Sequence, residues 1–318
     1  MNPHVFFVGC PRSGTTLLQR LANAHPELAV THETRWIAAW YEKRIGLTAE
    51  GYVSPEFVER LLAHRRFKAL KIKPADVARI YRSCKPVRYA DFVSMLFDRF
   101  AARRGKRLAG DKSPAYVRSL PTLHALWPKA KFVHIIRDGR DVCLSVLDWQ
   151  QGPRQLRTST DDPITTTAVW WDWNVRLGRE AGRRLGPELY QELRYEALID
   201  GVEQECTRLC SFLELPYDSA MLRFHEGRMR EEPGLDAKKA WRPVTAGLRN
   251  WREQMAGGEV ARFEAAAGHL LNELGYGGEA PPPSDEQIVS AARVRKAFVD
   301  DALARRRPVP TAWETGRT

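Results

Sequence analysis

The chain has 318 residues, of which 43% are hydrophobic and 28% are charged, so it can bury a sizeable core and is not an intrinsically disordered protein. Its net charge of +11 favours anionic partners but leaves nucleic acid, phosphorylated cofactors, sulfated glycans and acidic peptides open. The five cysteines form neither a C-x-x-C pair nor a disulfide framework, which favours reduced thiols and no metal site.

The N-terminal residues carry neither the basic segment nor the long apolar segment of a signal peptide. No later run of apolar residues is long enough to cross a membrane. We therefore expect a cytoplasmic protein without membrane contacts.

Two segments read as an apolar strand, a polar turn and a helix. The first has a strand over residues 4–10 and a helix from residue 15, and the second has a strand over 131–136 and a helix from residue 139. Two such units imply parallel strands joined by crossovers, so we predict an α/β fold with a P-loop NTPase-like parallel sheet flanked by helices.

Further elements follow from the same patterns. We expect a second short strand ending at Glu33, a strand running into "GDKSP" and a late strand ending at Tyr195. Helices are expected over most of 54–104, over 165–185, over 201–215 and over 259–274. The Gly- and Pro-rich stretch after residue 278 reads as a linker. We therefore predict one domain over 1–278 and, over 279–318, a linker with a basic C-terminal helical tail.

The first loop, "GCPRSGTT", has the G-x-x-x-x-G frame of a phosphate-binding loop ahead of a helix N-terminus. The lysine expected after Gly14, which would reach the β- and γ-phosphates, is replaced by Thr15. This replacement disfavours hydrolysis of a nucleoside triphosphate. Arg12 lies inside the loop and can pair with an anion's oxygens.

The second loop, "IIRDGRDVCLSV", places Arg137 at a strand end and Ser145 in the following helix, eight residues apart, so both can face one phosphate. A competing interpretation makes Asp138 the magnesium-binding acid of a kinase. The adjacent Arg137 and the missing loop lysine disfavour it.

Together, "PRSGTT" and this second loop, about 125 residues apart, resemble the two cofactor motifs of sulfotransferases that use 3′-phosphoadenosine 5′-phosphosulfate (PAPS). The resemblance implies PAPS as the co-substrate and no metal. It implies that Arg137 and Ser145 bind the 3′-phosphate and that Tyr195 contacts adenosine. The loop residues Arg12, Ser13, Gly14, Thr15 and Thr16 would bind the 5′-phosphosulfate, and Lys239 and Trp251 of a late basic loop would close over the nucleotide.

The segment "THETR" is similar to the protein-tyrosine sulfotransferase branch. A carboxylate at the carboxyl edge of the sheet suits a base for sulfuryl transfer, so Glu33 is the expected base, with His32 as an adjacent competitor. The resemblance adds Arg35 as a substrate contact and Lys112, together with Arg12, as a stabiliser of the transition state. Trp149 departs from the branch, which tends to carry another arginine there.

We therefore predict an enzyme that transfers the sulfuryl group of PAPS to a hydroxyl or amine. The acceptor is an acidic peptide tyrosine, a glycan or a small molecule. The alternatives are a Mg-dependent nucleotide kinase or NTPase with a degenerate P-loop, and a non-enzymatic nucleic-acid-binding protein. The lack of a known nucleic-acid motif argues against the last of these.

Overall fold

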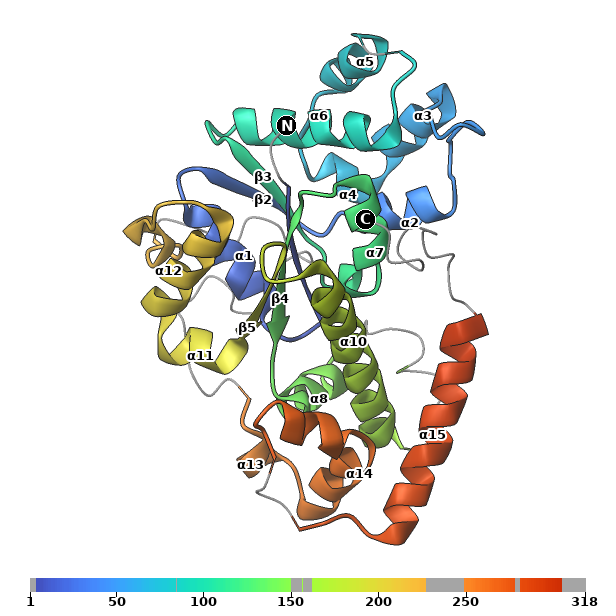
Figure 1. The fold of residues 1–318 in the computed structure, drawn as a ribbon, viewed down its shortest axis with the longest axis vertical. Helices are drawn as coiled ribbons and strands as arrows, with labels where there is room; N and C mark the ends of the chain where they lie inside the picture. Colours follow the sequence, from blue (N-terminus) through green and yellow to red (C-terminus); the bar gives the residue numbers. More distant parts are fainter. Residues whose placement is uncertain are drawn as a thin grey trace.

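In the computed structural model, the described residues are 4–83, 85–149, 156, 162–226, 249–277 and 281–304. Within them, five strands form a sheet of order β2-β3-β1-β4-β5, and every neighbouring pair is parallel (Figure 1). The strands are β1 (Val5–Gly9), β2 (Leu28–Thr31), β3 (Leu108–Lys112), β4 (Lys131–Ile136) and β5 (Tyr190–Arg194). The predicted parallel α/β sheet is confirmed.

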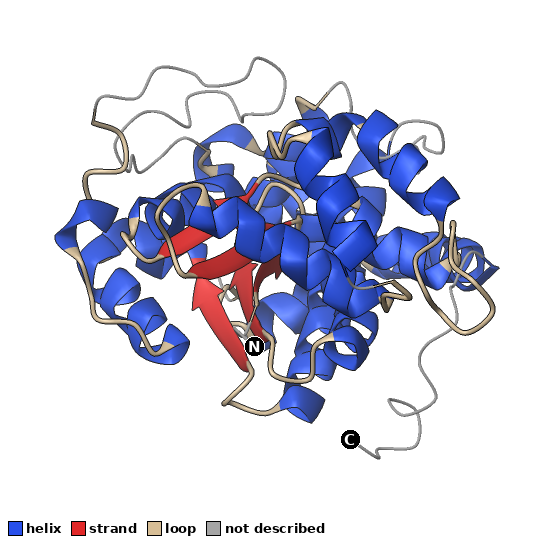
Figure 2. Ribbon diagram, turned by 90° about the horizontal axis from the view of Figure 1, so that it is seen from above, coloured by secondary structure: helices blue, strands red, loops and turns tan. Residues whose placement is uncertain are grey.

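Helices surround this sheet, which lies among them when the molecule is seen from above (Figure 2). They are α1 (Thr15–Ala24), α2 (Trp36–Glu42), α3 (Pro55–Ala63), α4 (Arg65–Lys68), α5 (Pro74–Ser83), α6 (Tyr89–Ala102), α7 (Leu120–Leu126), α8 (Gly139–Leu147), α10 (Pro163–Leu185), α11 (Tyr195–Asp200), α12 (Val202–Leu213), α13 (Trp251–Gln254), α14 (Gly257–Glu273) and α15 (Asp285–Ala304), with short 3₁₀ turns η1 (Pro114–Arg118) and η2 (Ser219–Met221). Within the part of the chain that the structure describes, none of them is both long and apolar enough to cross a bilayer.

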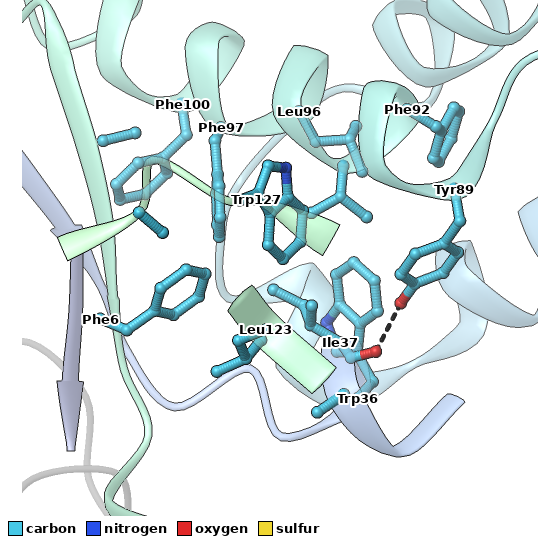
Figure 3. Packing of buried hydrophobic residues seen from close by; sticks show 14 of the residues in the cluster. Phe6, Trp36, Ile37, Tyr89, Phe92, Leu96, Phe97, Phe100, Leu123 and Trp127 are labelled. Atoms are coloured by element: carbon cyan, nitrogen blue, oxygen red, sulfur yellow. Dashed lines mark hydrogen bonds between the residues drawn. The ribbon is translucent and has the colours of Figure 1, made fainter. Parts of the chain in front are cut away.

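The central strand β1 is buried on both faces because its alternate side chains join two different hydrophobic clusters. Phe6 and Val8 pack with helices α2, α3, α6 and α7, whereas Val5 and Phe7 pack with α1 and α12. Figure 3 shows the first cluster, in which Phe6 lies near Trp127 and Tyr89 donates a hydrogen bond of 2.8 Å to the carbonyl of Ile37. This packing fixes the position of the loop that follows β1.

A third cluster joins the end of β4 to helices α8, α10, α14 and α15. Helix α15 packs against α10 and α14, and Figure 1 shows it beside them. Its Ala291 is buried, and Arg295 Nη1 donates to the nearly inaccessible carboxylate of Asp172 at 2.7 Å. A helix is present in the predicted C-terminal segment, but Asp285–Ala304 carries four acidic and three basic residues, so this helix itself is not basic. The domain boundary at residue 278 stays a prediction.

Two predicted strand ends were wrong by one or two residues. β2 ends at Thr31 rather than Glu33, because the amide of Thr34 turns away to donate to the side chain of Asp111. β5 ends at Arg194, and Tyr195 is the first residue of α11.

Candidate active site

The strands end at one edge of the sheet, and the loops that follow them form the candidate site. The register pairs Phe7 with Lys112 and Gly9 with Ile135 at this edge. In parallel sheets this edge is where ligands bind. The loop before α1, the loop after β2, the end of β3 and the loop after β4 all open there, and they carry most of the predicted site residues.

The phosphate loop requires glycine at position 14. Gly14 has φ +92° and caps the N-terminus of α1 without a side-chain hydrogen bond. A Cβ built there would lie 2.3 Å from Cδ2 of Tyr195, so the tyrosine ring packs directly on the loop. The first backbone N–H groups of α1, including those of Thr15 and Thr16, have no partner within the helix and can bind an anion at this edge.

Two buried polar atoms at this edge fit a bound phosphate or sulfate group. The Ser13 hydroxyl is inaccessible, and neither its Oγ nor Nε of Arg137 has a hydrogen-bond partner among the described residues. Buried polar atoms are nearly always satisfied in folded proteins. The loop therefore has donors for the oxygens of the phosphosulfate and phosphate groups that the resemblance implies.

Arg12 joins the two predicted motifs. Its Nε donates to Oγ of Ser145 at 2.9 Å, across 133 residues of sequence. Its guanidinium also lies 5.5 Å from the ring centroid of Trp149, the residue that departs from the tyrosine-sulfating branch. Burial and the charges of Arg249 and Arg137 lower the pKa of Arg12, so three arginines concentrate positive charge at this place.

Arg137 lies in the same region, held by an acid and an aromatic ring. Its Nη2 donates to Oδ2 of Asp141 at 3.0 Å, and its guanidinium lies 4.3 Å from the ring centroid of Tyr195. The other oxygen of Asp141 accepts the backbone N–H of Trp251 at 3.0 Å. Burial raises the pKa of Asp141 against the opposing effect of Arg137. Asp141 therefore ties α8 to α13 and orients Arg137.

The late loop is described only in part. The indole of Trp251 is buried, with the Arg140 guanidinium 3.6 Å from its ring centroid, so the structure assigns it a packing role. Its contact with a nucleotide stays a prediction. Lys239 lies outside the described residues.

Asp138, the candidate magnesium ligand of the kinase interpretation, caps a helix instead. It accepts the backbone N–H of Arg140 at 2.9 Å, and its other oxygen pairs with the Arg140 guanidinium at 2.8 Å. Arg140 is fully buried and also pairs with Glu264. The Asp138 carboxylate is thus committed to an internal ion pair that shapes the loop after β4.

Glu33 lies at the other end of the site, surrounded by cations. Its carboxylate accepts from Arg35 Nε at 2.7 Å and lies 3.4 Å from Lys112 Nζ and 3.6 Å from Arg66 Nη1. Burial opposes ionisation, but Lys112, Arg35 and Arg66 outweigh it and lower the pKa of Glu33. The group is therefore an ionised carboxylate at neutral pH, which a base must be.

Lys112 connects this carboxylate to the phosphate loop. Its side chain is 2% exposed, and its Nζ lies 3.4 Å from Oγ1 of Thr16 and 3.4 Å from Oε1 of Glu33. A single ammonium group thus faces both the first turn of α1 and the expected base. This is the position from which a lysine can stabilise charge on a departing group.

The sequence interpretation missed two residues that shape this end. Asp111 accepts from the Thr31 hydroxyl at 2.7 Å and from the Thr34 amide at 3.2 Å, which fixes the loop bearing Glu33. Burial raises the pKa of Asp111 to about 6 despite these hydrogen bonds. The place of Asp111 next to Lys112, at the end of a predicted strand, could have marked it as a residue of the site. Arg66, 33 residues after Glu33, donates to the Glu33 carbonyl at 2.9 Å, and no motif marks it.

Comparisons with known proteins agree with this geometry. A family model described as the sulfotransferase family matches residues 3–219. A protein-tyrosine sulfotransferase of Drosophila melanogaster is 26% identical over 294 residues, which cover 88% of this chain and 53% of that protein. Protein-tyrosine sulfotransferase A of Caenorhabditis elegans is 25% identical over 300 residues, covering 89% of this chain and 70% of that protein. The chain thus spans from about half to 70% of the length of these two curated relatives.

A solved structure supports the fold. The sulfotransferase domain from the olefin synthase of Synechococcus PCC 7002 aligns with a TM-score of 0.57 and 23% identity, covering 94% of each chain. The predicted resemblance and the predicted P-loop-like fold are confirmed.

Proposed function

Because the chain belongs to the sulfotransferase family, we propose that it transfers the sulfuryl group of PAPS to a hydroxyl group of an acceptor. The prediction of a sulfotransferase enzyme is confirmed at the level of the family. It is preferred over the alternatives of a kinase and a nucleic-acid-binding protein.

The contact between Arg12 and Ser145 carries the assignment of the co-substrate. It brings the phosphate loop after β1 against the helix that follows β4, and Arg137 lies beside them. One anion site at the loop and a second at α8 suit a nucleotide with separate 5′ and 3′ phosphate groups. The buried Ser13 hydroxyl and Arg137 Nε supply donors at these two places.

The acceptor end suits proton removal during transfer. The ionised Glu33 takes the proton of the acceptor hydroxyl as the acceptor oxygen bonds to sulfur. The bond from sulfur to the bridging oxygen breaks, and its electron pair stays on the departing 5′-phosphate. Lys112, Arg12 and the first N–H groups of α1 stabilise that negative charge.

The relatives' names make a protein tyrosine the first acceptor to try. Arg35, whose side chain is 52% exposed beside Glu33, is available as the proposed substrate contact. A phenolic hydroxyl suits the site chemically, because its proton is more acidic than that of an aliphatic alcohol and is therefore easier for a carboxylate to remove.

Transfer from radiolabelled PAPS tests the proposal. The full chain is incubated in EDTA with tyrosine-containing peptides, phenols and aliphatic alcohols, and labelled products are counted. We expect label on at least one hydroxyl acceptor, and we expect it to disappear with Glu33→Gln. Label transfer that needs added Mg²⁺, or that the Glu33→Gln variant retains in full, would contradict the assigned roles.

A further inference from the structure

An acidic side chain, Glu196, lies beside the part of the site that is proposed to bind phosphate. It is the second residue of α11 and follows Tyr195, whose ring lies 4.3 Å from the Arg137 guanidinium. A carboxylate next to a phosphate site opposes phosphate binding by charge repulsion. The contacts that Glu196 makes give a reason for its presence there.

Glu196 holds the peptide group that follows Arg137. Its Oε1 accepts the backbone N–H of Asp138 at 3.0 Å. The carbonyl of the same peptide group, that of Arg137, accepts the indole N–H of Trp171 at 3.2 Å. Trp171 is fully buried in α10. The peptide group between Arg137 and Asp138 is therefore fixed at both of its polar atoms, and so is the backbone from which the Arg137 side chain extends.

Tyr276 holds Glu196 in turn. Its hydroxyl donates to Oε2 of Glu196 at 2.6 Å, across 80 residues of sequence. Burial and the Glu196 carboxylate raise the pKa of Tyr276, so this hydroxyl stays protonated and remains a donor. The two oxygens of Glu196 thus have different partners, one in the loop after β4 and one after α14.

A turn after α14 brings Tyr276 to this place. Gly275 has φ +75°, and the N–H of Tyr276 donates to the carbonyl of Leu271 at 2.8 Å, as at many helix ends where glycine takes the left-handed conformation. The Tyr276 carbonyl accepts from the buried Arg140 of α8, and Figure 1 shows α14 near α8. Tyr276 lies outside residues 3–219, so the family match does not include it.

We propose that Glu196, held by Tyr276, is a positioning residue that fixes Arg137 for the 3′-phosphate of the nucleotide. The inference rests on the proposed function, because that function assigns the 3′-phosphate to Arg137. A loop that is already fixed before the nucleotide arrives lowers the entropic cost of binding the phosphate. Glu196 thereby strengthens phosphate binding in spite of its own negative charge.

Glu196→Ala is the test variant, and Glu196→Gln is its conservative counterpart. Glutamine keeps an oxygen for the Asp138 N–H and can donate its amide to the Tyr276 hydroxyl oxygen, whereas alanine loses both contacts. Glu192→Ala is the matched control. Glu192 is also a half-buried glutamate, but it lies on β5 and pairs with Arg179 at 3.0 Å.

The measurement is calorimetry of the full chain with 3′,5′-adenosine bisphosphate and with 5′-AMP, in EDTA. The ratio of the two affinities isolates the contribution of the 3′-phosphate. We expect Glu196→Ala to lower this ratio about fivefold or more while the affinity for AMP stays within about twofold. Glu196→Gln should keep at least about half of the wild-type ratio, and Glu192→Ala should leave the ratio unchanged.

Charge repulsion alone predicts the opposite sign, because removal of a negative charge beside a phosphate raises the affinity for it. A ratio that is unchanged or raised in Glu196→Ala therefore overturns the inference. An equal loss of affinity for both nucleotides also overturns it, since the loss would then not lie at the 3′-phosphate.

Tyr276→Phe provides a second test that keeps Glu196 and decides the inference if Glu196→Ala does not fold. It removes only the hydroxyl that donates to Glu196, so we expect the ratio to fall about twofold or more. Tyr190→Phe, which removes a hydroxyl that contacts Glu192, should leave the ratio unchanged. A wild-type preference for the bisphosphate that Tyr276→Phe retains in full refutes the role of Tyr276. Equal affinities of the wild type for the two nucleotides would instead refute the assignment of Arg137 in the proposed function, and the inference with it.

Discussion

The two ends of the site hold their charges in opposite ways. At the nucleotide end, arginines dominate: Arg12 and Arg137 are supported by a hydroxyl, an acid and aromatic rings. At the acceptor end, a single carboxylate, Glu33, is surrounded by Lys112, Arg35 and Arg66. The proposed nucleotide end thus concentrates positive charge, and at the proposed acceptor end the cations keep the Glu33 carboxylate ionised.

One positively charged edge of the sheet can therefore serve two proposed tasks, binding the nucleotide and keeping a base ionised. Lys112 stands between the two ends, in reach of Thr16 and of Glu33. Glu33 contacts the cations of the proposed acceptor end, so we expect a change at Glu33 to affect transfer without affecting nucleotide binding. A change at Ser145 or Arg137 should weaken nucleotide binding without changing the base.

Glu33→Gln should lower kcat by about 10²–10⁴-fold, the usual contribution of a positioned base. Affinity for 3′,5′-adenosine bisphosphate, measured by calorimetry, should stay within twofold of the wild type, because Glu33 lies at the proposed acceptor end. If instead kcat falls less than threefold, the base is another group, and His32→Gln becomes the next variant to measure.

Asp111→Asn should alter the pH dependence of stability. Burial raises the pKa of Asp111 from 3.8 to about 6, so between pH 4 and pH 6 the unfolded chain releases a proton that the folded protein still holds, and the wild type loses stability as pH rises through this range. At 1.36 kcal/mol per pH unit this amounts to about 3 kcal/mol. The asparagine variant lacks that loss. Urea unfolding at several pH values measures this. As pH rises from 4 to 6, the unfolding free energy of the wild type should fall relative to that of Asp111→Asn.

A difference between the two proteins that stays constant from pH 4 to pH 8 would show that Asp111 does not titrate in this range. Nucleotide binding by the folded variant is the control for the rest of the site, since Asp111 holds the loop after β2.

Ser145→Ala removes the acceptor for Arg12 Nε, a hydrogen bond worth about 1 kcal/mol. Affinity for 3′,5′-adenosine bisphosphate should fall roughly fivefold, as measured by calorimetry. The pH profile of kcat should not move, because Glu33 is untouched. Ser211→Ala on α12 is a matched serine-to-alanine control outside the site. A shift of the pH profile with Ser145→Ala would mean that the two ends are not separable.

Arg35→Gln should shift the acid limb of the kcat profile to higher pH. Arg35 is one of the cations that lower the pKa of Glu33, so its removal raises that pKa and the base is protonated at a higher pH than before. Arg35→Lys keeps the charge and should leave the limb nearer its original place. An acid limb that moves to lower pH in Arg35→Gln would contradict the conclusion that Arg35 lowers the pKa of Glu33.

The sequence predicted the fold and the nucleotide end better than the acceptor end. The continuous apolar run of β1 and the strand-loop-helix order are local patterns, so the parallel sheet and the loop at Gly14 followed from them. Glu33 and Lys112 were placed at the correct edge because parallel strands end together. These features depend on neighbours in the sequence or on a simple rule of sheets.

The missed residues act through tertiary contacts, and only Asp111, next to Lys112 at the end of β3, had a local signal in the sequence. Arg66 reaches Glu33 from α4, and the Asp111 carboxylate fixes a loop of the neighbouring strand. Trp251 lies under Arg140, a contact across more than a hundred residues that its place in a basic loop did not indicate. Such contacts are set by how the helices pack on the sheet.

The central claim is that Arg12 and Arg137 hold opposite ends of one adenosine bisphosphate. The most direct test is calorimetry of 3′,5′-adenosine bisphosphate against 5′-AMP in EDTA, with the wild type and with Arg137→Gln. A charge-assisted hydrogen bond is worth about 1.5–3 kcal/mol, so the wild type should bind the bisphosphate roughly 10–150-fold more tightly than AMP, and the variant should lose that preference. Equal affinity of the wild type for the two nucleotides would contradict the account.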